Sequence, residues 1–191
     1  PTTENEVSPK TKAIHMPNMN AIDGVILCGG RGLRLRSVSG TVPKPLVQVA
    51  GRPFLDFLVM KLYRSGFRRI ILCTGYGDKD IRDYFLASTR FISLDMELLF
   101  SREDIPLGTA GALKQAEGLI RSDPFVALNG DSFCQLDFGA FLAFHSQRQA
   151  DLSLALAEPQ DASDFGSVIF NPNHYRVDGF LEKVGPGGGH P

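Results

Sequence analysis

A glycine-rich turn followed by cationic side chains is the first feature of this sequence that could do chemistry. The turn is Gly29-Gly30-Arg31-Gly32, and it is followed by Arg34 and by Lys44, which lies in a Pro-Lys-Pro triplet. Glycine lets backbone N–H groups approach a ligand closely, and cations suit phosphate oxygens. The stretch from Asp23 to Pro53 therefore predicts a site for a nucleotide phosphate chain. The glycines alone are explained as well by a plain turn between a strand and a helix.

Two common phosphate-binding loops are excluded by the residues around this turn. The sequence contains no GxxxxGK(S/T) pattern, so the chain is not a P-loop NTPase. The run Gly30-Arg31-Gly32 begins like the dinucleotide fingerprint GxGxxG, but Leu35 stands where its third glycine is required. A phosphate site here must therefore belong to another class.

A carboxylate follows a second apolar run. Asn129-Gly130-Asp131 comes directly after Phe125–Leu128. A carboxylate in this place, close to a triphosphate, can hold Mg²⁺ together with phosphate oxygens and water. The alternative is an ordinary Asn-Gly-Asp turn without a ligand.

Strands and helices that alternate along the chain must position these groups. Apolar runs predict strands at 25–28, 70–73, 96–100 and 125–128, and alternating segments predict further strands at 152–156, 167–170 and 175–182. Helical spacing predicts helices from Pro53 to Gly66, from Asp78 as the capping residue to Phe85, from Leu107 to Ile120 and from Phe138 to Gln147.

This alternation predicts an α/β fold with a mainly parallel sheet covered by helices on both faces. Ligands bind such sheets at the carboxyl ends of the strands. The glycine turn after Cys28 and Asp131 after Leu128 both lie at strand ends of this kind. The predicted architecture thus brings the phosphate site and the carboxylate to the same edge of the sheet.

The coupling of GGRGLRL with PKP strongly resembles the GGxGTRL…PKP signature of the sugar-1-phosphate nucleotidylyltransferases, and the resemblance extends over roughly Ala21 to Lys183. It implies a Rossmann-like three-layer αβα sandwich with a mainly parallel, mixed sheet. It also implies that Arg34 and Lys44 contact phosphates. Leu33 stands where the family usually has threonine, so a hydroxyl donor is lost there. The implied contacts of the loop with the nucleotide come from Leu27, Gly29, Gly30, Gly32 and Leu33.

The resemblance assigns further roles along the chain. Asp131 matches the metal-binding aspartate of the family, which implies Mg²⁺ as the cofactor. The motif LGTAGAL resembles the nucleoside-binding turn, so Gly108 and Thr109 are expected near the base and the ribose, although a plain helix start explains the same residues. On the sugar side, Gly166 would make room for the sugar, Glu182 would accept hydrogen bonds from its hydroxyls, and Lys183 would hold its phosphate. A solvated strand end is the alternative for the Glu-Lys pair.

The reaction that the resemblance implies joins a nucleoside triphosphate to a sugar 1-phosphate and releases pyrophosphate. Its catalytic residues would be Arg34, Lys44 and Asp131, which act by positioning and by offsetting negative charge. Within the family the chain most resembles the guanylyltransferases of heptose 1-phosphate and mannose 1-phosphate, which serve nucleotide-sugar and cell-envelope polysaccharide synthesis. Two alternatives stay open: a uridylyl-, thymidylyl- or cytidylyltransferase of the same fold, and a non-catalytic nucleotide-sugar-binding fragment.

A preference for guanine is expected from Glu103, which lies where related enzymes place a side chain on the base edge. A carboxylate only accepts hydrogen bonds, and guanine presents two adjacent donors, the N1–H and the 2-amino group. Uracil and thymine place two carbonyl oxygens beside a single N–H. The neighbouring Asp104 could serve instead, cytosine also has an amino donor, and a solvated loop position is the common fate of glutamate.

Composition sets outer limits on the function. The chain has 191 residues, 43% of them hydrophobic, and a net charge of −1. These values predict a globular chain without a broad basic surface for nucleic acid or an anionic membrane. No apolar run approaches the roughly 20 residues that span a bilayer, and residues 1–20 lack a secretory apolar segment. We therefore expect a cytoplasmic protein, with its oligomeric state left open.

The three cysteines lie in or just after apolar runs, which predicts buried free thiols rather than disulfides or zinc ligands: Cys28, Cys73 and Cys134.

The expected organisation is a flexible leader at 1–20, a nucleotidyltransferase domain at 21–184 and a flexible glycine-rich tail at 185–191. Family members continue through a further strand that lines the sugar pocket, and they later supply a second metal-binding aspartate. No carboxylate side chain follows Lys183 here. The resemblance therefore implies a domain shortened at its C-terminal side and catalytically incomplete, unless another carboxylate substitutes.

Overall fold

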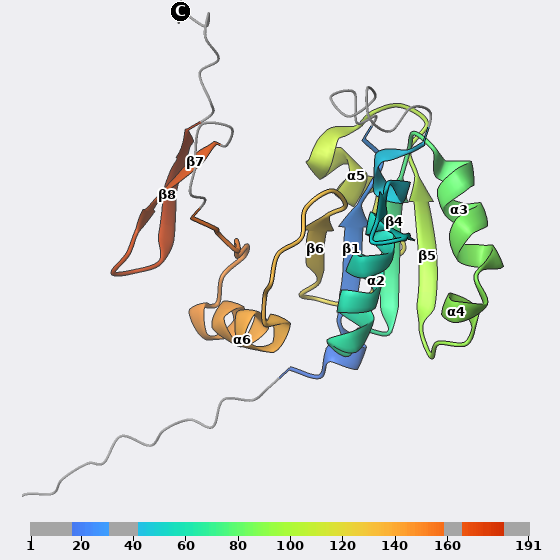
Figure 1. Cartoon of the computed structure of the whole chain (residues 1–191). Coiled ribbons are helices and arrows are strands. Elements are labelled where there is room, and N and C mark those ends of the chain that lie inside the picture. Colours follow the sequence, from blue (N-terminus) through green and yellow to red (C-terminus); the bar gives the residue numbers. More distant parts are fainter. Residues whose placement is uncertain (1–16, 31–41, 159–165, 182–191) are drawn as a thin grey trace, which may run out of the picture. The chain divides into compact units, whose positions relative to one another are not determined.

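The computed structural model describes residues 17–30, 42–158 and 166–181. They divide into two units, one up to Ala150 and one from Asp151 onward, which are described separately. The first unit is built on a four-stranded sheet in the order β5-β4-β1-β6 (Figure 1). Its neighbouring strands are all parallel. The prediction of a parallel central sheet is confirmed for these strands: β1 (Asp23–Leu27), β4 (Arg69–Thr74), β5 (Glu97–Arg102) and β6 (Val126–Asn129).

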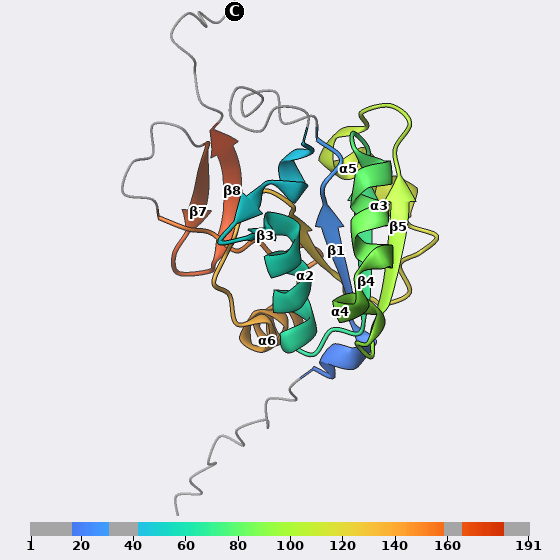
Figure 2. The ribbon, with the colours of Figure 1, turned by 45° about the vertical axis from the view of Figure 1, so that its right-hand side comes forward.

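Helices cover both faces of this sheet, as predicted. Successive residues of β1 point to opposite faces: Ile26 joins the larger apolar core and Val25 the smaller one. The larger core lies under α2 (Phe54–Arg64), α3 (Asp78–Ala87), α4 (Thr89–Ile92) and α6 (Phe138–Arg148). Figure 2 shows α2 and α3 side by side on that face. The smaller core includes Ala112 and Ala116 of α5 (Gly108–Ala116).

Two helix boundaries differ from the prediction. The residue before α3 is Gly77 in a left-handed conformation, so Asp78 is the first helical residue rather than the cap. Its carboxylate instead accepts a hydrogen bond from the Thr74 hydroxyl at 2.5 Å. Helix α5 ends at Ala116, before the predicted Ile120, and residues 117–119 form a turn. Gly118 lies in this turn, and glycine has a low helix propensity.

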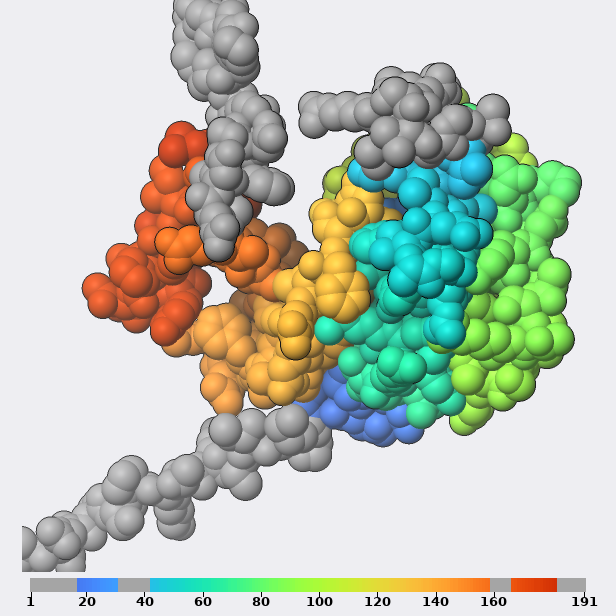
Figure 3. Space-filling view, viewed as in Figure 1, coloured from blue at the N-terminus to red at the C-terminus, as the bar shows by residue number. Residues whose placement is uncertain are grey.

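The segment 44–53, which directly precedes α2, contains secondary structure that the sequence analysis did not predict. It contains the 3-10 turn η3 (Lys44–Leu46) and the hairpin of β2 (Gln48–Val49) and β3 (Arg52–Pro53). Figure 3 shows this segment, in light blue, on the surface next to α2. A second 3-10 turn, η1 (Met19–Ala21), precedes β1.

The edge position of β6 changes its burial. The sequence predicted a buried strand here, but only Val126 of β6 is buried. Because β6 is the last strand of the order, no further described strand covers its outer side.

Cys134 is exposed, so the prediction of a buried thiol is wrong there, whereas Cys28 and Cys73 are buried as predicted. Among the described residues, no helix is long and apolar enough to cross a membrane.

The second unit contains one antiparallel hairpin of β7 (Ser167–Asn171) and β8 (Arg176–Leu181). These strands confirm two of the three predicted here. The third prediction, a strand at 152–156, is wrong: the segment has no strand pairing, and Leu152 is 76% exposed. Alternating apolar residues favour a strand only where a neighbouring strand accepts its backbone hydrogen bonds.

Candidate functional site

The carboxyl ends of the four parallel strands are joined by backbone hydrogen bonds. The N–H of Cys28, just after β1, donates to the carbonyl of Cys73 in β4 at 2.9 Å. The N–H of Gly130, after β6, donates to the carbonyl of Leu27 at 2.8 Å, and that of Glu103, after β5, to Thr74 at 2.8 Å. The loops that follow these strands therefore start from one connected edge, where the sequence analysis placed the site.

Gly29 and Gly30 lie at the end of β1, as predicted for a phosphate-binding turn. A Cβ at Gly29 would come within 2.9 Å of Glu103 Oε1 and 3.3 Å of the Gly75 nitrogen, so only glycine fits without displacement. A Cβ at Gly30 would meet no atom within 4 Å, which leaves its backbone open to an approaching group. Leu27, the last residue of β1, is half-buried. The other predicted residues of this loop, Gly32, Leu33 and Arg34, lie outside the described residues.

Lys44 and Asp131 come together across the sheet edge. Lys44 Nζ donates to Asp131 Oδ2 at 2.7 Å, with 30% and 45% of their side chains exposed. Lys44 opens η3, whereas Asp131 follows β6, so the tertiary structure alone brings them into contact. The hydrogen bond from Lys44 lowers the pKa of Asp131, and the Ser132 hydroxyl adds a hydrogen bond at 3.1 Å. The carboxylate is therefore ionised near neutral pH and reaches solvent.

Asp131 fits a metal ion that arrives with a phosphate ligand. Within the described residues, no three His, Cys, Asp or Glu side chains cluster as metal ligands. Mg²⁺ in proteins is commonly held by one or two carboxylates, with substrate phosphates and water completing its shell. A single ionised, solvent-accessible carboxylate matches that arrangement. The described residues alone do not form a complete set of metal ligands.

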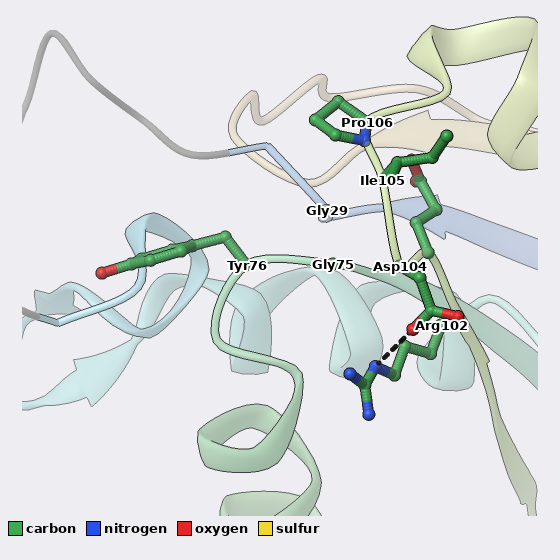
Figure 4. Close-up of a pocket in the computed structure, with 8 residues that line it drawn as sticks. Gly29, Gly75, Tyr76, Arg102, Asp104, Ile105 and Pro106 are labelled. Atoms are coloured by element: carbon green, nitrogen blue, oxygen red, sulfur yellow. Dashed lines mark ion pairs between the residues drawn. The ribbon is translucent and has the colours of Figure 1, made fainter.

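An open pocket of about 160 Å³ lies beside the glycine turn (Figure 4). Glu103 lines this pocket, and its Oε2 accepts the backbone N–H of Leu107 at 2.9 Å. The carboxylate thereby holds the loop that leads into α5. Asp104, 86% exposed, pairs with Arg102 at 3.4 Å. The residues that line the pocket come from the ends of β1, β4 and β5: Gly29, Gly75, Tyr76, Arg102, Glu103, Asp104, Ile105 and Pro106.

Gly108 and Thr109 begin α5 on the far side of this loop. Gly108 has a φ of 71°, a left-handed conformation that glycine adopts without strain, and a Cβ there would meet no atom within 4 Å. No side chain caps the start of α5, so its first N–H groups lie at an exposed helix end. Both predicted residues are thus exposed at the start of a helix that follows the pocket.

The structure describes one of the three predicted sugar-side residues. Gly166 immediately precedes β7 in the second unit, and Glu182 and Lys183 lie outside the described residues.

The sequence analysis missed Gly75, Tyr76 and Gly77 in the loop between β4 and α3. Gly75 and Tyr76 line the pocket, and the N–H of Tyr76 donates to the Gly29 carbonyl at 3.2 Å. The available signal was a glycine pair directly after a buried strand, the same pattern that drew attention to the turn after β1.

The buried cysteines do not supply a nucleophile. Burial raises the pKa of the Cys28 thiol strongly and that of Cys73 to about 11, so both stay protonated near neutral pH. Cys28 Sγ donates to the Cys73 carbonyl at 3.2 Å. These thiols are part of the packing beneath the site.

The chain is similar to known proteins over most of its length. The family model for "Nucleotidyl transferase" matches residues 23–185. The mannose-1-phosphate guanyltransferase of Hypocrea jecorina is 36% identical over 163 residues, which are 84% of this chain and 44% of that protein. The D-glycero-alpha-D-manno-heptose 1-phosphate guanylyltransferase of Aneurinibacillus thermoaerophilus is 36% identical over 162 residues, 85% of this chain and 68% of that protein.

Solved structures of related proteins have a similar fold. The crystal structure of HddC from Yersinia pseudotuberculosis complexed with GMP-PN superposes with a TM-score of 0.73 and 37% identity, over 85% of this chain and 69% of that chain. A UDP-glucose pyrophosphorylase from Acinetobacter baumanii, 23% identical with a TM-score of 0.67, shares the fold. The chain spans about half the length of several curated relatives that it matches, 44% in the mannose-1-phosphate guanyltransferase above.

Proposed function

The chain belongs to the nucleotidyl transferase family, and we propose that it joins a nucleoside triphosphate to a sugar 1-phosphate with release of pyrophosphate. One observation supports this most directly: Lys44 and the ionised Asp131 lie 2.7 Å apart at the strand edge that also carries the glycine turn. A cation, a carboxylate and an open glycine backbone at one edge are the groups that a metal-bound triphosphate needs.

In the proposed reaction, an oxygen of the sugar phosphate attacks the α-phosphorus in line. The new O–P bond forms while the bond from the α-phosphorus to the bridging oxygen breaks, and pyrophosphate leaves with that electron pair. Lys44 would donate to phosphate oxygens, and the backbone N–H groups of Gly29 and Gly30 would lie against the phosphate chain. Mg²⁺, when bound to Asp131, would offset the negative charge that develops on the phosphates.

Without nucleotide, Lys44 and Asp131 neutralise each other. Binding of a metal-bound triphosphate would replace this ion pair by two others, Lys44 with a phosphate and Asp131 with the metal. Both groups remain partly exposed, so the exchange needs side-chain rotation rather than unfolding. We therefore expect Mg²⁺ and the triphosphate to bind together, with little affinity of the site for Mg²⁺ alone.

We propose GTP as the preferred triphosphate and a mannose- or heptose-type sugar 1-phosphate as its partner. The two curated relatives above are named as guanyl- or guanylyltransferases of these sugar phosphates, and the Yersinia structure holds GMP-PN. Glu103 lines the pocket. Although its Oε2 already accepts the Leu107 N–H, each carboxylate oxygen has two lone pairs, so Glu103 can still accept from the N1–H and 2-amino group of guanine.

The test is pyrophosphate release with GTP, UTP, dTTP and CTP against a panel of sugar 1-phosphates, with triphosphate binding measured by titration calorimetry. We expect binding and turnover to be highest with GTP. Lys44→Ala should lower the rate by on the order of 10²-fold, because it removes a charge partner of the transition state, and it should weaken triphosphate binding by the loss of a cation. The matched control is Lys114→Ala, an exposed lysine of α5 that pairs with Glu117 and lies outside the pocket. Equal behaviour of both variants would contradict the proposal.

A further inference from the structure

We propose that the loop Gly75-Tyr76-Gly77 positions the two phosphate-binding segments of the site and sets the spacing between them. This inference rests on the proposed function and adds to it residues that contact the phosphate-binding segments rather than the phosphate. The loop, called the GYG loop below, connects β4 to α3.

The first contact of the GYG loop is with the glycine turn. A Cβ at Gly75 would lie 2.8 Å from the Gly29 carbonyl oxygen and 3.2 Å from the Gly29 Cα. The N–H of Tyr76 donates to that same carbonyl at 3.2 Å. Figure 4 shows Gly75 and Gly29 close together at the edge of the pocket. Backbone therefore packs on backbone here, and a side chain at Gly75 would displace Gly29 itself.

The second contact is with the segment that carries Lys44. A Cβ at Gly77, which has a φ of 77°, would lie 2.7 Å from the Cβ of Pro43. Pro43 is buried and directly precedes Lys44 at the start of η3. A side chain at Gly77 would therefore displace Pro43, and with it the backbone position of Lys44.

The GYG loop is itself held firmly on both sides. Thr74, fully buried at the end of β4, donates its hydroxyl to Asp78, and Asp78 pairs with Arg82 of α3 at 2.9 Å. The N–H of Asp78 donates to the Gly75 carbonyl at 3.1 Å, and that of Ile81 to the Gly77 carbonyl at 3.0 Å. Because the loop is fixed to both a core strand and a helix, added atoms in it would move Gly29 and Pro43.

A single loop thus contacts residues on both sides of the sequence stretch 31–41. The open backbone of Gly30 lies before that stretch, and Lys44 lies after it. Both must meet one phosphate chain in the proposed function, so the distance between them matters for affinity and rate. A misplacement of about 1 Å can cost on the order of 10²-fold in an enzyme reaction.

The first test compares Gly75→Ala with Gly118→Ala in the full chain. Gly75 has no left-handed φ, so its substitution adds the contact with Gly29 and little backbone strain. A Cβ at Gly118 would meet nothing within 4 Å, which makes it the matched control. We expect Gly75→Ala to weaken GTP binding by on the order of 10- to 100-fold in titration calorimetry, and Gly118→Ala to bind like the wild type. Thermal unfolding checks that each variant is folded. Should Gly75→Ala not fold, Pro43→Ala, which trims the ring that packs on Gly77, serves as the second variant.

A double-mutant cycle separates positioning from a general loss of stability. Gly77→Ala should weaken GTP binding when Lys44 is present but add no further loss in the Lys44→Ala background, because it acts through Lys44. Gly75→Ala acts through Gly29 and should keep its effect in that background. If the wild type binds GTP and neither glycine variant changes the affinity, or if Gly77→Ala loses as much affinity in the Lys44→Ala background as in the wild type, this inference alone would be overturned. Absence of triphosphate binding by the wild type would overturn the proposed function and this inference with it.

Discussion

At the scale of single residues, Asp131 places an ionised carboxylate at the strand edge within reach of solvent. The hydrogen bond from Lys44 lowers its pKa, and 45% of its side chain is exposed. An exposed ion pair of this kind contributes at most about 1 kcal/mol to the stability of a protein. Stability thus gives little reason for the pair, whereas a metal-bound triphosphate would use both members.

We predict that Asp131→Asn keeps the fold and loses the Mg²⁺ dependence of triphosphate binding. Asparagine has the same shape but no negative charge to hold the ion. Titration calorimetry with and without Mg²⁺ measures this dependence. Asp83→Asn is the control, because Asp83 is an exposed aspartate on α3 that pairs with Lys79. If Mg²⁺ strengthened triphosphate binding equally in wild type and Asp131→Asn, the metal role of Asp131 would be wrong.

The lowered pKa of Asp131 predicts a pH dependence of stability. Because the carboxyl pKa in the folded chain lies below its ordinary value of 3.8, the ion pair contributes its full stability above about pH 4. That contribution falls as the pH drops through the lowered pKa. Lys44→Ala should raise the pKa of Asp131 toward the ordinary value and remove this pH-dependent part. Carboxyl-carbon NMR titration of both proteins checks the direction, and an unchanged Asp131 pKa in the variant would contradict it.

Glu103→Gln tests which base the pocket prefers. Glutamine can still accept the Leu107 N–H with its amide oxygen, so the loop should stay in place. It replaces one acceptor oxygen by a donor, which suits the carbonyls of uracil better than the donors of guanine. We expect the preference for GTP over UTP to fall by about 1–3 kcal/mol, measured as the ratio of their affinities. Glu117→Gln, directly after α5, is the control, and a preference that survives in Glu103→Gln would exclude Glu103 as the base reader.

At the scale of elements, buried charges tie the helices of one face together. Asp56 of α2 is 2% exposed, accepts a hydrogen bond from the Tyr84 hydroxyl of α3 at 3.1 Å, and pairs with Arg90 of α4 at 2.6 Å. The network joins three helices that cover the larger core but contributes no residue to the pocket.

We predict that Asp56→Ala lowers the free energy of unfolding by about 2–4 kcal/mol, because it leaves Tyr84 and Arg90 without this partner in a partly buried place. Urea denaturation measures the change, and Asp80→Ala, an exposed aspartate on α3, is the control. Triphosphate affinity should stay near the wild-type value under conditions in which the variant is folded. Equal stability of the two variants would show that the network contributes nothing.

At the scale of the whole molecule, the net charge of −1 gives no general attraction for anions. Affinity for a triphosphate must then come from the local groups at the strand edge. Binding there should stabilise the fold by mass action, by about 2.7 kcal/mol when GTP is present at 100 times its dissociation constant.

Thermal unfolding with and without Mg²⁺ and GTP measures this stabilisation. We expect the midpoint temperature to rise in the wild type and to rise much less in Lys44→Ala. A midpoint that GTP and Mg²⁺ leave unchanged at saturating concentration would speak against a folded binding site.

The sequence by itself determined the central strands, the positions of the helices and the edge of the sheet that carries the candidate site. These features depend on local patterns: apolar runs bounded by glycine give buried strands, and their alternation with helices gives a parallel sheet. Because parallel strands end at a common edge, Gly29 and Asp131 could be placed at one end without coordinates.

The tertiary structure alone decided which distant residues touch. The 2.7 Å contact of Lys44 with Asp131 and the packing of Gly75 on Gly29 depend on strand order and loop paths, which no local pattern encodes. Burial of β6 depended in the same way on its place at the sheet edge, and the segment 152–156 formed no strand because pairing, not alternation, makes a strand. Short-range patterns therefore gave the elements, and long-range contacts gave the site its geometry.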